Sequence, residues 1–141
     1  MNYDVAIVIV THNKIFDSCL LSLKNILSTT KLNTAVVIVD NASTEFSAHE
    51  KFHEHLPNSI VILRNKNYGF GSSCNRAVQE VKADYYFFLN PDTELIDNET
   101  ITKLHSFLQQ NPKVGIVAPR ITHFSGEHQE TCRRFPTWYM P

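Results

Sequence analysis

The sequence lacks two features whose absence excludes whole classes of protein. It has no long apolar run, because the first, VAIVIV at 5–10, is too short for a transmembrane helix and lacks the basic flank and cleavage site of a secretory signal. It also has almost no net charge, with 13 Lys and Arg against 14 Asp and Glu, and so lacks the positive field of a general nucleic-acid binder. We therefore expect a cytoplasmic protein with no nucleic-acid partner.

Cysteine is scarce as well. Cys19, Cys74 and Cys132 are odd in number and widely spaced, which predicts three free thiols and argues against a disulfide framework. What the chain does have is 43% hydrophobic residues over 141 positions, enough for one core of ordinary size. Because it also has no internal repeat and no low-complexity linker, residues 1–141 are predicted to form a single domain.

Apolar runs and apolar stripes alternate along the chain. Continuous apolar runs predict buried strands at 5–10, 35–40, 59–63, 84–89 and 114–119. Apolar residues at three- and four-residue steps predict helices at 15–28, 72–83 and about 98–110, the second capped by Ser72 or Ser73. No helix or strand is predicted for the polar stretch with three histidines that precedes the third strand. This order predicts an α/β fold, a mainly parallel twisted sheet with helices on both faces.

Polar residues collect where the predicted strands end. They are Thr11, His12 and Asn13; Asp40, Asn41 and Ser43; Asn65 and Asn67; and Asn90, Asp92 and Thr93. In parallel sheets, ligands bind beyond the carboxyl ends of the strands, so these ends predict a site. Each cluster taken alone can also be a helix cap or a turn. The glycines of NYGFGSS can likewise serve a turn or bring backbone N–H groups to a phosphate.

Four segments together resemble a known family. VAIVIVTHN, VVIVDNAST, NKNYGFGSSCN and YYFFLNPDTEL, in this order, are similar to the nucleotide-sugar-binding half of family-2 glycosyltransferases with the Rossmann-like GT-A fold. The similarity is greatest to the rhamnosyltransferase-like members that build O-antigen and other bacterial surface polysaccharides. It covers residues 4 to about 137. The ordered motifs are specific for the family and much less so for the sugar.

The resemblance implies a set of site residues. Those that would bind the nucleotide sugar are Val10, Thr11, Asn13, Asp40, Asn41, Gly69, Phe70, Gly71, Asn75 and Asn90. Of the pair that would bind the base, Asp40 is favoured, because the second position is the amide Asn41. Asp92 matches the last aspartate of the family's metal motif and would hold Mg²⁺ or Mn²⁺, while Asn90 replaces the first carboxylate. An amide oxygen can ligate such a cation but adds no charge.

The resemblance also implies a reaction and its partners. The cation would bridge the diphosphate of a UDP- or dTDP-sugar, and a saccharide or lipid-linked acceptor would attack the anomeric carbon with inversion. A lipid-linked acceptor would bring peripheral membrane association at the cytoplasmic face of the inner membrane. The family's general base follows the fifth strand by a considerable distance, so we expect it beyond Pro141 and expect this chain to be a truncated, N-terminal portion.

The last residues of the chain bear on the acceptor side. Arg133 and Arg134 match an Arg-rich segment there, whereas Glu127 and Glu130 are interpreted as surface residues rather than as the base. The alternative function is an inactive fragment that only binds nucleotide sugar.

Two unrelated interpretations are less favoured. A dinucleotide-binding domain would need a third glycine where Cys74 stands, and its loop would follow the first strand instead of the third. Zinc sites can be drawn from His49, His53 and His55, or from His123, His128 and Cys132. Neither set has paired ligands at zinc-finger spacing, so solvated surface histidines are the preferred interpretation.

Overall fold

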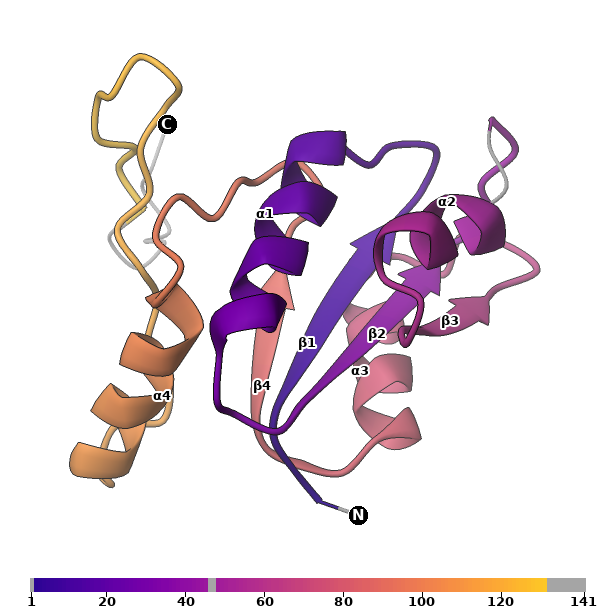
Figure 1. The fold of residues 1–141 in the computed structure, drawn as a ribbon. Helices are drawn as coiled ribbons and strands as arrows, with labels where there is room; N and C mark the ends of the chain where they lie inside the picture. Colours follow the sequence, from indigo (N-terminus) through magenta and orange to yellow (C-terminus); the bar gives the residue numbers. More distant parts are fainter. Residues whose placement is uncertain (1, 46–47, 132–141) are drawn as a thin grey trace, which may run out of the picture.

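A four-stranded parallel sheet forms the centre of the molecule (Figure 1). The computed structural model describes residues 2–45 and 48–131. The strands are β1 (Tyr3–Thr11), β2 (Thr34–Asp40), β3 (Ile60–Leu63) and β4 (Ala83–Leu89), in the spatial order β3-β2-β1-β4. All three strand pairs are parallel, which confirms the predicted type of sheet.

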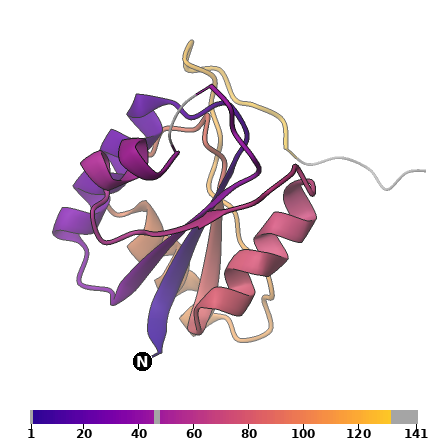
Figure 2. The ribbon, with the colours of Figure 1, turned by 90° about the vertical axis from the view of Figure 1, so that its right-hand side faces the viewer.

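Helices cover both faces of this sheet, as predicted. They are α1 (Asp17–Thr29), α2 (Ala48–His55), α3 (Phe70–Glu80) and α4 (Thr100–Gln110). One core cluster joins the sheet to side chains of α1, α2 and α4, among them Leu23, Phe52 and Ile101. The second cluster joins the opposite face to Cys74 and Ala77 of α3. Figure 2 shows α3 on one side of the strands and α1 and α2 on the other.

The strand predicted at 114–119 is wrong. Residues 114–119 are irregular and join no sheet, and Ile116 is 90% exposed. Gly115 packs no side chain and Pro119 has no N–H to donate, so this apolar run has little to hold it in a ladder.

Two local predictions around the helices also change. The unassigned histidine-containing stretch forms α2, because Phe52 and the adjoining Leu56, four residues apart, are both buried against the sheet. Neither predicted serine caps α3, since the helix begins at Phe70 and the residue before it is Gly69, with φ 81°. Ser73 lies one turn inside the helix.

None of the helices in the described part of the chain is long and apolar enough to cross a membrane. Arg133, Arg134 and Cys132 lie outside the described residues, so the acceptor-side prediction and the third free thiol stay predictions.

Two leucines on α1 provide a matched test of this packing. Leu23 is fully buried against the sheet, whereas Leu21 is 49% exposed. Leu23→Ala should lower the free energy of unfolding by about 2–5 kcal/mol, because it removes buried methyl groups and leaves a cavity. Leu21→Ala should cost less than about 1 kcal/mol. Urea unfolding followed by circular dichroism measures both, and equal losses would contradict the layer arrangement.

Candidate functional site

The ends of β1 and β2 meet at one edge of the sheet. Thr11 and Asp40, the last residues of these strands, are register partners, and the Asn41 N–H donates to the Thr11 carbonyl over 2.8 Å. The parallel pairing therefore brings two of the predicted polar clusters side by side.

A hydrogen-bonded chain ties the loops after β1 and β2 together. Asp40 is 4% exposed, and its Oδ1 and Oδ2 accept from the Ser43 hydroxyl and from the Ser43 N–H respectively, the second bond at 3.1 Å. The same Ser43 oxygen accepts from the Asn13 N–H at 2.8 Å. Asn13, at φ 57°, accepts the Thr44 N–H on its side-chain oxygen at 2.7 Å. Asp40 thus organises both loops, while each of its oxygens keeps a further lone pair for a ligand.

Asn41 connects the sheet to α3. Its side chain is buried, and its Oδ1 accepts from the Ser73 hydroxyl at 2.6 Å. Its Nδ2 donates to the Gly69 carbonyl at 3.5 Å, and its own carbonyl lies 2.8 Å from Nδ1 of His12. The amide therefore fixes the start of α3 against the end of β2. Phe70, Gly71 and Asn75, predicted to bind the nucleotide sugar, lie on the exposed first turns of the same helix.

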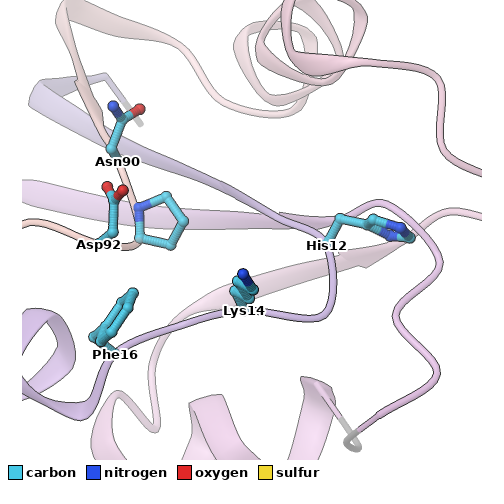
Figure 3. Close-up of a pocket in the computed structure, with 6 residues that line it drawn as sticks. His12, Lys14, Phe16, Asn90 and Asp92 are labelled. Carbon is cyan, nitrogen blue, oxygen red and sulfur yellow. The ribbon is translucent and has the colours of Figure 1, made fainter.

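A pocket of about 330 Å³ lies between the loop after β1 and the end of β4 (Figure 3). Its lining residues are His12, Lys14 and Phe16 from the first segment, and Asn90, Pro91 and Asp92 from the second. The Phe16 N–H donates to the Pro91 carbonyl at 3.0 Å, and the Thr93 hydroxyl to the Asn90 carbonyl at 2.7 Å. The first bond holds the two walls together, and the second stabilises the turn after β4.

The polar side chains of the β4 wall remain available to a ligand. Within the described residues, neither the Asn90 amide nor the Asp92 carboxylate makes a hydrogen bond or ion pair with another side chain, and both are exposed in the pocket. In that same part of the chain no three His, Cys, Asp or Glu residues lie close enough to hold a metal ion. One carboxylate and one amide fit a hard cation only if substrate phosphates and water complete its ligands, which is how Mg²⁺ is commonly bound.

Of the polar residues predicted at the strand ends, the pocket contains His12, Asn90 and Asp92, and only the last two were also assigned to the donor or the cation. Asp40 and Asn41, at the end of β2, and Gly69, at the start of α3, gather along the same edge of the sheet without lining the pocket. Lys14 and Phe16 were missed. Both residues directly follow the first strand, in THNKIF, and this position could have identified them. The sequence pattern was instead interpreted as a cap followed by the start of a helix.

Comparison with known proteins decides the family. The sequence profile described as "Glycosyl transferase family 2" matches residues 6–141. The chain belongs to glycosyltransferase family 2. Among curated proteins, no significant match to this family-2 chain is found.

Solved structures similar to the family-2 chain include forms of TarS from S. aureus. Residues 1–349 of TarS in complex with UDP match with a TM-score of 0.64 and 25% identity, over 79% of this chain and 33% of that one. The same TarS segment described without UDP gives 0.61 and 24%, again over 79% and 33%. A longer TarS chain gives 0.63 and 25%, over 78% and 20%. The family-2 chain thus spans a third or less of these proteins, and the likeness confirms the predicted GT-A type of fold.

Both described cysteines are free and buried. Burial, followed by the Asp92 carboxylate, raises the pKa of the Cys19 thiol from 9.0 to about 11, and burial also raises that of Cys74. Cys19 lies below the pocket wall, with its Sγ 3.7 Å from the Asn90 carbonyl. Because the thiolate is the reactive form, both thiols should be inert in the folded protein.

Thiol reactivity tests this environment. At pH 8, iodoacetamide should alkylate Cys19 and Cys74 at least about tenfold more slowly in the native family-2 chain than in urea, because folding removes access and disfavours the thiolate. Mass spectrometry of the separate peptides gives each rate. Since the pKa of Cys19 is raised on folding, the stability it contributes should fall as pH rises from 9 towards 11. Native alkylation as fast as in urea would contradict the burial.

The contact between Asn41 and α3 can be tested with adjacent serines. Ser73→Ala should destabilise the fold by about 1–3 kcal/mol, because it leaves the buried Asn41 oxygen without its donor. Ser72, the exposed neighbour, is the matched control, and Ser72→Ala should change stability by no more than about 0.5 kcal/mol. Thermal or urea unfolding checks both. If the two variants behave alike, the hydrogen bond does not anchor the helix.

Proposed function

We propose that the chain is the nucleotide-sugar-binding part of an inverting, metal-assisted glycosyltransferase of bacterial surface polysaccharide synthesis. The observation that carries the proposal is a pocket with a free carboxylate at the carboxyl edge of a parallel sheet, in a family-2 chain. Support comes from the similar S. aureus TarS, whose solved structures include a complex with UDP. The donor is a UDP- or dTDP-sugar, with rhamnose as the proposed sugar, and the acceptor is a saccharide or lipid-linked saccharide.

Each strand end has a proposed part in donor binding. Thr11, Asn13 and Asp40 bind the nucleoside, with the remaining lone pairs of the Asp40 carboxylate accepting from the base. The start of α3 offers the phosphates the backbone N–H groups of Phe70, Gly71 and Ser72, because those of the first helical turn have no partner within the helix. Because Asn41 and Ser43 hold these segments together, the donor meets a surface that is already ordered, which reduces the entropy lost on binding.

Asp92 and Asn90 are the proposed protein ligands of Mg²⁺ or Mn²⁺. When bound, the cation would supply positive charge to stabilise the diphosphate leaving group. Asp92 contributes the one negative charge of this pair, and Asn90 an uncharged oxygen. The acceptor hydroxyl attacks the anomeric carbon from the face opposite the diphosphate, the sugar–phosphate bond breaks, and a general base takes the hydroxyl proton.

A second function has its own supporting observation. Among the described residues, Asp92 is the one carboxylate that lines the pocket, and it is assigned to the cation. A carboxylate that could act as the base is therefore missing from this pocket lining. This favours a chain that binds nucleotide sugar without transferring it unless further residues supply the base.

Calorimetry separates these functions from unrelated ones. UDP or dTDP should bind more tightly with Mg²⁺ or Mn²⁺ than with EDTA, and Asp92→Ala should abolish this difference because it removes the charged ligand. Glu94→Ala, an exposed acidic residue two positions away, should keep it. A metal-dependent affinity that survives in Asp92→Ala would contradict the cation site, and a preference for NAD would contradict the function. Hydrolysis-corrected sugar transfer to an acceptor then distinguishes transfer from binding alone.

A further inference from the structure

Lys14 is the one lysine or arginine among the described residues that lines the pocket. Figure 3 shows it between Phe16 and His12 on one wall, with Asn90 and Asp92 on the other. Lys14 was not among the site residues predicted from the sequence. Its side chain is exposed to the pocket, so a ligand there would meet one ammonium group and one carboxylate.

The backbone at Lys14 is held while its side chain is left free. The Thr11 hydroxyl donates to the Lys14 carbonyl, and the preceding residue, Asn13, is fixed by Ser43. Two residues further on, Phe16 is bonded to Pro91 across the pocket. Over residues 2–45 and 48–131, no acidic side chain forms an ion pair with Lys14. The ammonium group therefore keeps all three of its N–H donors for water or a ligand.

The charges of the pocket indicate what that ligand is. Without a cation, the Asp92 carboxylate would repel the diphosphate of a donor. Asn90 carries no charge, so it strengthens cation binding less than a carboxylate at that position would. An ammonium group on the facing wall offsets the Asp92 charge and offers charge-assisted hydrogen bonds to phosphate oxygens. The pocket is thus suited to a diphosphate even before a cation adds its charge.

We propose that Lys14 binds the diphosphate of the nucleotide-sugar donor. Its ammonium group supplies part of the charge neutralisation that a cation would provide if a second carboxylate held it. This inference rests on the proposed function. It assigns the loop after β1 to the phosphates as well as to the nucleoside. It also means that binding of nucleoside diphosphate persists in part when divalent cations are removed.

The experiment compares uridine with UDP, and thymidine with dTDP, in EDTA by calorimetry. For the nucleoside diphosphate that binds wild-type protein, Lys14→Met should lower the affinity about tenfold or more, because a charge-assisted hydrogen bond is lost. Affinity for the matching nucleoside should not change, which also shows that the variant is folded. Lys14→Arg should retain most of the diphosphate affinity. Lys24→Met, an exposed lysine on α1 outside the pocket, is the control for loss of one positive charge.

The outcomes separate this inference from the proposed function. If Lys14→Met binds the diphosphate in EDTA as tightly as wild type, or if Lys24→Met weakens it equally, the role of Lys14 is overturned and nucleotide binding stands. If Lys14→Met loses nucleoside and diphosphate affinity in equal proportion, Lys14 only shapes the loop and the inference is again overturned. If wild-type protein binds neither nucleoside diphosphate, with or without cations, the proposed function fails and this inference with it.

Discussion

The parallel pairing of β1 with both of its neighbours is the constraint on which the rest of the molecule depends. β1 lies between β2 and β4, and its residues from Val5 to Thr11 are buried. Because the strands run in one direction, the residues that follow β1, β2 and β4 emerge at one edge of the sheet, where helices do not cover them. Thr11 beside Asp40, and Asn90 beyond Leu89, owe their proximity to this register. A slip of the register would move the core side chains to the wrong faces and separate the polar ends.

The elements that sequence reasoning found are those whose signal is local. β1, β2 and β4 are continuous apolar runs with polar residues at their ends, and α1 carries a clear apolar stripe, so their patterns need no knowledge of partners. The run at 114–119 looks the same in one dimension, but a strand exists only with a neighbour to pair with. α2 was missed for the opposite reason, since its sequence is mostly polar and offers little apolar pattern around Phe52 and the adjoining Leu56, both of which are buried.

The site residues also separate into those that have a local signal in the sequence and those that do not. Asp92 and Asp40 could be found because polar residues after buried strands have a defined place in a parallel sheet. The pairing of Ser73 with Asn41 could not, because it joins residues 32 positions apart and depends on how α3 approaches β2. Lys14 looked like an ordinary loop lysine. Only the backbone hydrogen bond from Phe16 to Pro91, which holds the loop after β1 against the end of β4, places Lys14 in the pocket wall that faces Asp92.

The strand order has a kinetic consequence. β4 is late in the chain yet pairs with β1, so that Tyr3 meets Ala83. Pairings between such distant segments must close long loops before they gain any contact energy, which makes parallel sheets slow to fold. During synthesis, the apolar β1 is complete long before β4 can cover its free side. Until then its unpaired backbone and exposed valines and isoleucines can associate with other chains, so this protein should depend on rapid docking of α1 and β2 to keep nascent molecules apart.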